Sequence, residues 1–292
     1  MNIVITGSLG NISQPLAKEL VQKGHTVTVI SSKPEKQKDI EALGVIAAIG
    51  SLEDMGFLTA AIANADTLFA MVPPNFGTMD QVGYYRHIGS NYVQALQHSA
   101  VKHVVYLSSY GAHLDKGTGF ILGAHHVENM LNELPGIAIT HLRPGYFYYN
   151  LFGFTKMIKE AGFMGSNFGG DDKLALVQPV DIAAAAAEEI LAPATGRKVR
   201  YIASDECTPH EIAQAIGAAI GQPDLKWVTF TDDQLQENLE KNGVPAPLAR
   251  NFVEIGASTR SGALLADYAL HPPAVLGKVK LADFAKEFAA AF

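Results

Sequence analysis

The chain opens with Met1-Asn2-Ile3-Val4-Ile5-Thr6-Gly7-Ser8-Leu9-Gly10-Asn11-Ile12-Ser13, a short apolar run that passes directly into a glycine turn. An amphipathic segment, 14–23, follows the turn, and a second apolar run occupies 26–30. A strand, a glycine turn, a helix and a second strand make up a βαβ unit. Because backbone N–H groups and the positive end of the helix dipole meet at such a turn, the sequence predicts a diphosphate-binding site there.

The glycine turn has the spacing G-x-x-G-x-x-S, with Gly7, Gly10 and Ser13 at its three fixed positions. Gly7 permits the tight turn and Gly10 lets the backbone approach phosphates, while Ser13 stands where glycine would favour close packing of helix on strand. The turn follows a strand and opens a helix, which is the context that dinucleotide binding requires. We expect cofactor contacts from Gly7, Ser8, Leu9, Gly10, Asn11 and Ile12. The alternative is a tight turn with a structural role only.

The end of the second strand indicates which dinucleotide binds. An acidic side chain there would bind the ribose hydroxyls of NAD and repel the 2′-phosphate of NADP. The chain instead has Ser31, Ser32 and Lys33, and no acidic residue precedes Glu35. Two hydroxyls and an ammonium group suit a phosphate, so we expect NADP rather than NAD. In the alternative interpretation Ser32 only caps a helix that begins near Pro34, and Lys33 is solvated.

Apolar strands and amphipathic helices alternate through the first half of the chain. Further strands are predicted at 45–49, which we expect to be buried, and at 67–72, 103–107, 137–142 and 198–202. The helix after 45–49 is expected to open at Ser51, with Ser51 and Asp54 at capping-box spacing. The alternation predicts the α/β class, with a doubly wound parallel sheet of the Rossmann type.

The second half of the chain predicts a smaller, mostly helical C-terminal region. The expected dinucleotide-binding core covers 1–150 and is completed by about 174–205. The expected substrate-binding region covers 151–173 and 206–292. Open α/β sheets bind ligands at the carboxyl ends of their strands, so we expect this region to lie over those ends.

Composition argues against several classes of function. The net charge of −7, from 22 Lys and Arg against 29 Asp and Glu, disfavours a nucleic-acid surface, which needs a basic face. We expect no membrane segment and no signal peptide, because no apolar run reaches spanning length and the N-terminus passes straight into a strand. Cys207 is the only cysteine, which excludes an internal disulfide and favours the cytoplasm. No histidine and carboxylate motif has metal-ligand spacing, so we expect no metal.

Several motifs resemble one protein family over essentially the whole chain. They are Thr6-Gly7-Ser8-Leu9-Gly10, Lys33-Pro34-Glu35-Lys36, Val101-Lys102-His103-Val104-Val105-Tyr106-Leu107-Ser108-Ser109, Leu142-Arg143-Pro144-Gly145-Tyr146-Phe147, Val180-Asp181-Ile182-Ala183 and Asn242-Gly243-Val244-Pro245-Ala246-Pro247. Together they resemble the NmrA-like branch of the atypical short-chain dehydrogenases and reductases, and within it the NADPH-dependent quinone reductases and triphenylmethane-dye reductases. The resemblance implies a Rossmann fold, an NADPH cofactor and hydride transfer to an aromatic acceptor. It also implies that Ser51 lies near the adenine, where relatives often carry aspartate.

Residues at further strand ends complete the expected cofactor site. They are Met71, Val72, Pro73, Ser108, Ser109, Pro144, Gly145, Tyr146 and Phe147. Aromatic residues gather at two of these strand ends, with Phe76 after the fourth strand and the run 146–149 after the sixth. They favour a flat apolar ligand or the nicotinamide ring itself. In the alternative interpretation they form the core between the two regions, and we expect a mixture of both roles.

The candidates for a proton donor are Tyr110, His113 and His125, which follow the fifth strand or lie on the next helix. Classical members of the wider family use a Tyr-x-x-x-Lys pair, and none of the 10 tyrosines here has a lysine four residues later. In the reductase relatives a lysine or histidine precedes a helical glutamate by four residues. Glu128 matches that glutamate, but Ala124 occupies the earlier position. Hydride transfer to an electrophilic acceptor depends mainly on orientation, so an enzyme without the pair is chemically reasonable.

The sequence therefore favours an NADPH-dependent oxidoreductase that transfers a hydride to a quinone-like or other small aromatic acceptor. The main alternative is a protein of the same family that binds NAD(P) without turnover and senses redox state through protein partners. A further alternative is an isomerase or reductase that acts on another carbonyl metabolite. A homodimer and a protein partner both remain open, and neither a nucleic acid nor a membrane is expected as a partner.

Overall fold

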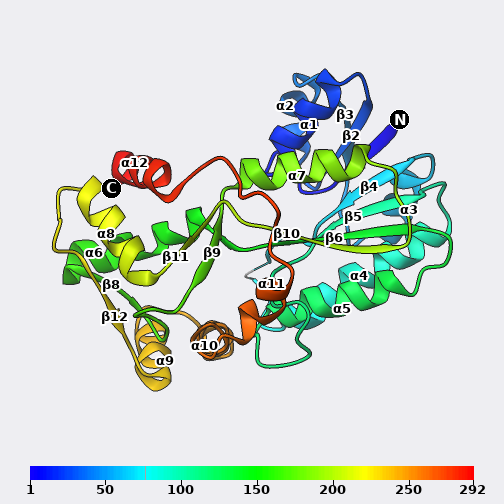
Figure 1. Cartoon of the computed structure of the whole chain (residues 1–292). Coiled ribbons are helices and arrows are strands. Elements are labelled where there is room, and N and C mark those ends of the chain that lie inside the picture. Colours follow the sequence, from blue (N-terminus) through cyan, green and yellow to red (C-terminus); the bar gives the residue numbers. More distant parts are fainter. Residues whose placement is uncertain (76) are drawn as a thin grey trace. The chain divides into compact units, whose positions relative to one another are not determined.

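The computed structural model describes residues 1–75 and 77–292 and divides into two compact units. The first unit comprises Met1–Ser109, Gly123–Arg143 and Ile182–Arg200. The second unit comprises Tyr110–Leu122, Pro144–Asp181 and Tyr201–Phe292. The chain passes between them repeatedly, so neither unit is a continuous stretch of sequence (Figure 1).

A seven-stranded sheet is the frame of the first unit, with the strand order β10-β6-β5-β4-β1-β2-β3. Its strands are β1 (Asn2–Ile5), β2 (Thr26–Ser31), β3 (Ile46–Ile49), β4 (Thr67–Ala70), β5 (His103–Leu107), β6 (Ala138–Pro144) and β10 (Arg197–Ile202). The neighbouring strands from β3 to β6 pair in parallel, which confirms the predicted doubly wound α/β class. The order reverses between β1 and β4, and open sheets of this kind bind ligands at such a reversal.

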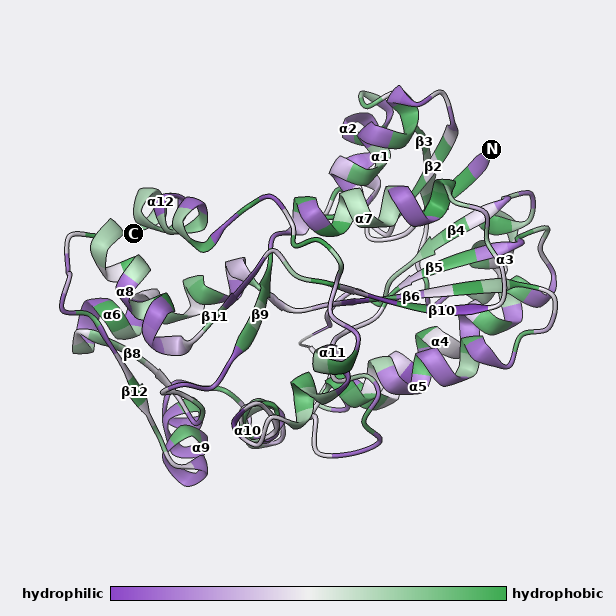
Figure 2. Ribbon diagram, in the orientation of Figure 1, coloured by the Kyte–Doolittle hydropathy of each residue, from purple (hydrophilic) through white to green (hydrophobic). Residues whose placement is uncertain are grey.

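Helices pack on this sheet through apolar stripes. They are α1 (Ser13–Gln22), α2 (Gln37–Glu41), α3 (Met55–Ile62), α4 (Gln81–Gln97), α5 (Ile121–Asn132) and α7 (Pro179–Leu191), with a 3₁₀ turn η1 (Pro34–Lys36). Hydrophilic and hydrophobic residues alternate along α4 and α5 in Figure 2, as expected of helices with one buried face. Leu68 of β4, Tyr92 of α4 and Val104 of β5 are fully buried members of one hydrophobic cluster.

Short strands and helices make up the second unit. They are β7 (Tyr146–Phe147), η2 (Tyr148–Phe154), α6 (Thr155–Ala161), β8 (Phe163–Ser166), β9 (Leu174–Val177), β11 (Asp205–Cys207), α8 (Pro209–Ala219), β12 (Lys226–Thr229), α9 (Asp232–Lys241), α10 (Ala246–Arg260), η3 (Ala263–Leu265), α11 (Ala266–Leu270) and α12 (Leu281–Ala291). Aromatic rings fill its main cluster, where Tyr148 stacks on Phe284 with 5.0 Å between ring centroids. Within the described residues, no helix is both long and apolar enough to cross a membrane.

Two local predictions differ from the structure. The strand β3 is not buried, because it is the edge of the sheet and only β2 pairs with it; Ile46 is 55% exposed. The helix α3 begins at Met55, and its N-cap is Asp54, which accepts a hydrogen bond from the Phe57 N–H, rather than Ser51. Several residues in this turn are able to cap a helix, and the point where β3 ends decides which one does.

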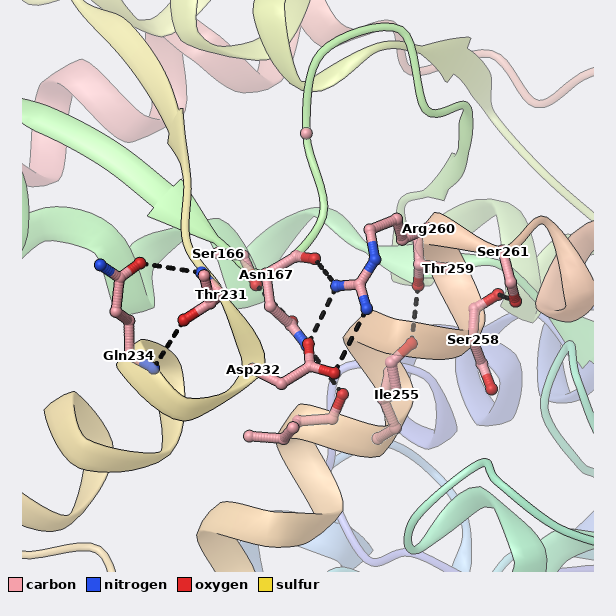
Figure 3. Close-up of polar contacts among 12 residues, drawn as sticks. Ser166, Asn167, Thr231, Asp232, Gln234, Ile255, Ser258, Thr259, Arg260 and Ser261 are labelled. Atoms are coloured by element: carbon pink, nitrogen blue, oxygen red, sulfur yellow. Dashed lines mark hydrogen bonds and ion pairs between the residues drawn. The ribbon is translucent and has the colours of Figure 1, made fainter.

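A buried asparagine ties three segments of the second unit together (Figure 3). Asn167 follows β8, and its Nδ2 donates to Asp232 Oδ1 at 2.8 Å and to the Val253 carbonyl at 2.9 Å. Arg260 of α10 donates to both Asp232 carboxylate oxygens, at 2.9 and 3.2 Å, and to the Asn167 carbonyl. The Arg260 guanidinium holds the pKa of Asp232 below its ordinary value. These contacts fix α9 and α10 on the end of β8.

The close approach of α10 to Asn167 gives a stability prediction. A Cβ added to Gly256 would lie 1.7 Å from Asn167 Oδ1. Glycine to alanine in a helix ordinarily stabilises a protein by up to about 1 kcal/mol. We expect Gly256→Ala to lower the free energy of unfolding by about 2 kcal/mol instead, because Asn167 must move and loses its hydrogen bonds.

Urea denaturation followed by circular dichroism measures this change. Gly153→Ala is the matched control, because a Cβ added there meets no atom within 4 Å. If the two variants unfolded at the same urea concentration, the packing of Gly256 on Asn167 would not be the reason for glycine at this position.

Candidate functional site

The turn between β1 and α1 has the backbone that a phosphate site requires. Gly7 has φ of 96°, and Ser8, with φ of 55°, is the one non-glycine residue with positive φ among those described. The Gly10 N–H donates to the Gly7 carbonyl at 3.1 Å and closes the turn. In the described part of the chain no side chain caps the start of α1, where Ile12 is the N-cap residue, while the Gln14 N–H donates to the Gly10 carbonyl at 3.0 Å and Pro15 has no N–H.

Close packing explains the residue types in this turn. A Cβ on Gly7 would lie 2.4 Å from Met71 Sδ and 2.6 Å from Ser13 Oγ, so glycine is required by contact as well as by φ. Ser13 stands where the sequence pattern favours a third glycine. Its hydroxyl donates to the Thr6 carbonyl at 2.8 Å and is buried, so the helix is held on the strand by a hydrogen bond.

A buried tyrosine, which the sequence did not indicate, supports the turn from α4. The Tyr92 hydroxyl donates to the Met71 carbonyl at 2.7 Å and lies 3.2 Å from Thr6 Oγ1. Thr6 Oγ1 in turn accepts from the Met71 N–H at 2.9 Å. Burial raises the pKa of Tyr92 above its ordinary value, so the hydroxyl stays protonated. These contacts fix the ends of β1 and β4, from which the predicted cofactor loops begin.

The three polar residues at the end of β2, Ser31, Ser32 and Lys33, differ in their exposure. Ser31 is buried, and its Oγ accepts from Ser8 Oγ at 2.9 Å and from the Lys33 N–H at 3.2 Å. Ser32 and Lys33 are exposed. The N-cap interpretation of Ser32 is wrong, because Lys33 precedes the 3₁₀ turn that starts at Pro34. Ser31 therefore shapes the turn, while Ser32 and Lys33 are the exposed polar side chains that follow it.

The neighbouring strand ends place the remaining predicted contacts of the first unit. Ser51 is partly exposed and follows Gly50, whose N–H donates to the Ser31 carbonyl at 2.9 Å. After β4, Met71 and Pro73 are partly exposed and Val72 is buried. Phe76, which the sequence assigned to a pocket wall, lies outside the described residues. The structure thus brings the turn, Ser31, Ser51 and Met71 together at the carboxyl ends of adjacent strands.

A buried ion pair between Glu128 of α5 and Arg143 of β6 lies beside the end of β5, and sequence reasoning missed it. Ser108 Oγ donates to Glu128 Oε1 at 2.5 Å, and Arg143 donates to both Glu128 carboxylate oxygens, from Nε at 2.9 Å and from Nη2 at 2.5 Å. Burial alone would raise the pKa of Glu128, but the hydrogen bonds from Arg143 and Ser108, together with the charges of His141 and Arg143, outweigh it and lower that pKa. The adjacent Ser109 is partly exposed. The acidic residue that matched the reductase pattern is therefore engaged by arginine.

His125 lies on α5 and is partly exposed. Its Nε2 is 2.9 Å from Asn129 Nδ2, and its ring centroid is 5.5 Å from that of His126. Burial, together with Arg86 and His125, lowers the pKa of His126. Among the described residues, no three His, Cys, Asp or Glu side chains form a group that could hold a metal ion.

The other predicted site residues belong to the second unit. Tyr110 is 4% exposed and packs in a hydrophobic cluster with Leu264 and Tyr268, and burial raises its pKa. Its N–H donates to the Pro144 carbonyl at 3.0 Å. His113 follows it and is partly exposed. Tyr110 is therefore mainly a packing residue within its own unit.

The aromatic run after β6 is divided between surface and core. A Cβ on Gly145 would lie 2.1 Å from the Ala175 carbonyl, so β7 runs close beside β9. Tyr146 and Phe147 are partly exposed, whereas Tyr148 is fully buried. Tyr149 is 37% exposed, and its partial burial raises the pKa of its hydroxyl to about 12. Only part of the run is therefore in the core.

The hydroxyl of Tyr92 gives a testable prediction. We expect Tyr92→Phe to lower the free energy of unfolding by about 1–2 kcal/mol, because the part-buried Met71 carbonyl loses its donor. We also expect weaker dinucleotide binding, because the ends of β1 and β4 loosen. Tyr84→Phe on the same helix is the control, since Tyr84 is only partly buried. Denaturation and nicotinamide fluorescence titration measure both effects, and unchanged values for Tyr92→Phe would refute the supporting role.

Comparison with known proteins places this geometry in a family. The model of the NmrA-like family matches residues 1–260. The NAD(P)H azoreductase of Xenophilus azovorans is 27% identical, over 99% of this chain and 99% of that protein.

The structure is also similar to solved ones. The NADPH-dependent quinone oxidoreductase of Escherichia coli, complexed with NADPH, has a TM-score of 0.82 at 23% identity and covers 98% of this chain and 99% of that one. The triphenylmethane reductase of Citrobacter sp. has a TM-score of 0.81 at 20% identity and covers 99% of this chain and 100% of that one. These two structures share the fold, and the family match confirms what the sequence motifs predicted: the chain belongs to the NmrA-like family.

Proposed function

We propose that the protein binds NADPH at the glycine turn and transfers its hydride to a small aromatic, quinone-like acceptor. The observation that carries this proposal is the turn itself, in which glycine φ, close packing and an uncapped helix start combine at the switch point of the sheet. The azo, quinone and dye reductases to which the chain is similar support both the cofactor and the acceptor class.

The end of β2 supports NADPH over NADH. No acidic side chain stands between Ser31 and Pro34 to repel a 2′-phosphate, and the Lys33 ammonium is exposed there. The Ser8–Ser31 hydrogen bond holds the left-handed backbone of Ser8, whose cost is of the order of 1 kcal/mol. This strain supports a site role, because such conformations persist where the surroundings hold them for a purpose.

The reaction makes limited demands on acid catalysis. Quinones and cationic dyes are electrophilic, so orientation against the nicotinamide supplies much of the rate. We assign the proton-donor role to one of His113, His125 and Tyr110, of which the histidines are better suited. Burial raises the pKa of Tyr110, so its hydroxyl is a poor acid at neutral pH.

A second function has one observation in its favour. A family member that binds NAD(P) without turnover would not need a proton donor, and here His125 is engaged with Asn129 while Tyr110 is packed among apolar side chains. In either case we propose that 151–173 and 206–292 bind the acceptor or regulate access to the cofactor.

The cofactor preference gives a prediction. We expect Lys33→Ala to weaken NADPH binding by about fivefold and to leave NADH binding unchanged, because only NADPH carries the 2′-phosphate. Titrations of nicotinamide fluorescence measure both affinities. Lys36→Ala is the control, because the Lys36 ammonium pairs with Asp39 at 3.4 Å on the same surface segment. Tighter binding of NADH than of NADPH by the unaltered protein would count against the proposed cofactor.

Turnover separates the reductase from the sensor. We expect the protein to oxidise NADPH in the presence of quinones, azo dyes and triphenylmethane dyes, which the loss of the absorbance of the reduced nicotinamide measures. Tight NADPH binding with no oxidation across this panel would favour the redox-sensor function and overturn the proposed reductase function.

A further inference from the structure

Two buried charges stand where β5 and β6 end, inside the first unit. Glu128 and Arg143 are 4% and 7% exposed. The guanidinium donates to both carboxylate oxygens, and Ser108 donates to Oε1 as well. The end of β5, the helix α5 and the strand β6 therefore share one carboxylate.

Stability alone is a weak reason for such a pair. Removing two charges from water offsets most of their attraction, and apolar side chains of similar volume are often as stable or more so. What an ion pair adds is a fixed geometry, because a bidentate arginine defines the position of the carboxylate. The geometry fixed here is that of a strand end, since the Ser108 N–H also donates to the Leu142 carbonyl at 2.8 Å.

The ion pair determines that the Ser108 hydroxyl is the donor of its hydrogen bond to Glu128. An ionised carboxylate only accepts hydrogen bonds, so the Ser108 proton points at Glu128. Ser108 is also 8% exposed. The Ser108 hydroxyl is thus engaged in a buried hydrogen bond. The next residue, Ser109, is partly exposed and can contact a ligand.

We propose that Glu128 and Arg143 are positioning residues that, through Ser108, fix the end of β5 and aim Ser109 at the nicotinamide half of the cofactor. This inference rests on the proposed hydride transfer. In this proposal Ser108, which the sequence predicted as a cofactor contact, instead holds the backbone at the end of β5 in place. A misplacement of about 1 Å at the reacting atoms costs on the order of 100-fold in rate, so a loosened strand end slows hydride transfer even when the cofactor is bound.

The first unit offers a matched control. Glu189 of α7 is 5% exposed and accepts from Lys198 at 2.8 Å and from Arg200 at 3.0 Å, both on β10. It is a buried carboxylate paired with cations on a strand of the same sheet, as Glu128 is. The strand β10 carries none of the residues predicted to contact the cofactor, so loss of the Glu189 carboxylate lowers stability without disturbing the site.

The test compares Ser108→Ala, the double variant Glu128→Met with Arg143→Met, and Glu189→Gln. For each we measure the melting temperature, the Kd of NADPH by nicotinamide fluorescence and kcat with a quinone. For Ser108→Ala and for the double variant we expect kcat to fall at least about tenfold. We expect their Kd for NADPH to stay within about twofold, because the glycine turn belongs to other strands. Glu189→Gln melts at a lower temperature and keeps the kcat of wild type.

The double variant keeps the proposal falsifiable, because two methionines restore apolar packing and remove both charges together. Wild-type kcat in the double variant, or in Ser108→Ala, would overturn the positioning role while leaving the reductase function intact. If the wild-type protein binds NADPH without turnover, the reductase function fails. The fluorescence emission of bound NADPH then tests positioning, which predicts a changed emission in both variants and is refuted by an unchanged one. Absence of NADPH binding by wild type would overturn both.

Discussion

Contact between Gly7 and the two side chains beside it, Met71 and Ser13, is the constraint on which the site depends. The space that a Cβ would need is filled by Met71 Sδ and Ser13 Oγ. Helix α1 and the end of β4 can approach the turn this closely only because residue 7 has no side chain. The turn then takes a left-handed backbone at Gly7 and Ser8, and the Ser8 N–H donates to the Ile30 carbonyl at 3.0 Å, which ties the turn to the end of β2.

Hydrogen bonds inside the unit decide which hydroxyls remain for a ligand. Ser13 and Ser31 are both engaged with their own unit, the first with the Thr6 carbonyl and the second with Ser8 and the Lys33 N–H. The hydrogen bonds of these short side chains stabilise a tight turn that has no third glycine. The exposed polar groups at the end of β2 are consequently Ser32 and Lys33, and charge there is concentrated on one ammonium.

Buried carboxylates recur in the first unit with different consequences. Glu189 joins α7 to β10, a strand that carries none of the predicted cofactor contacts, whereas Glu128 joins α5 to the ends of β5 and β6. Both are held ionised by cations that lower their pKa values against the opposing effect of burial. Both carboxylates form the same kind of buried ion pair. They differ in position, because only the Glu128 pair lies at strand ends that carry predicted cofactor contacts.

The sequence by itself determined the βαβ opening, the parallel α/β class and the family, because glycine spacing and apolar periodicity are local consequences of backbone sterics and burial. It misjudged β3 as buried, since edge position depends on strand order. It could not find Tyr92 or the partner of Glu128, because these contacts join residues 86 and 15 positions apart. Only the tertiary structure decided that the hydroxyls of Ser31 and Ser108 bond to groups inside the first unit while Ser32 and Lys33 are exposed, because the direction of a hydroxyl is set by neighbours that folding brings together.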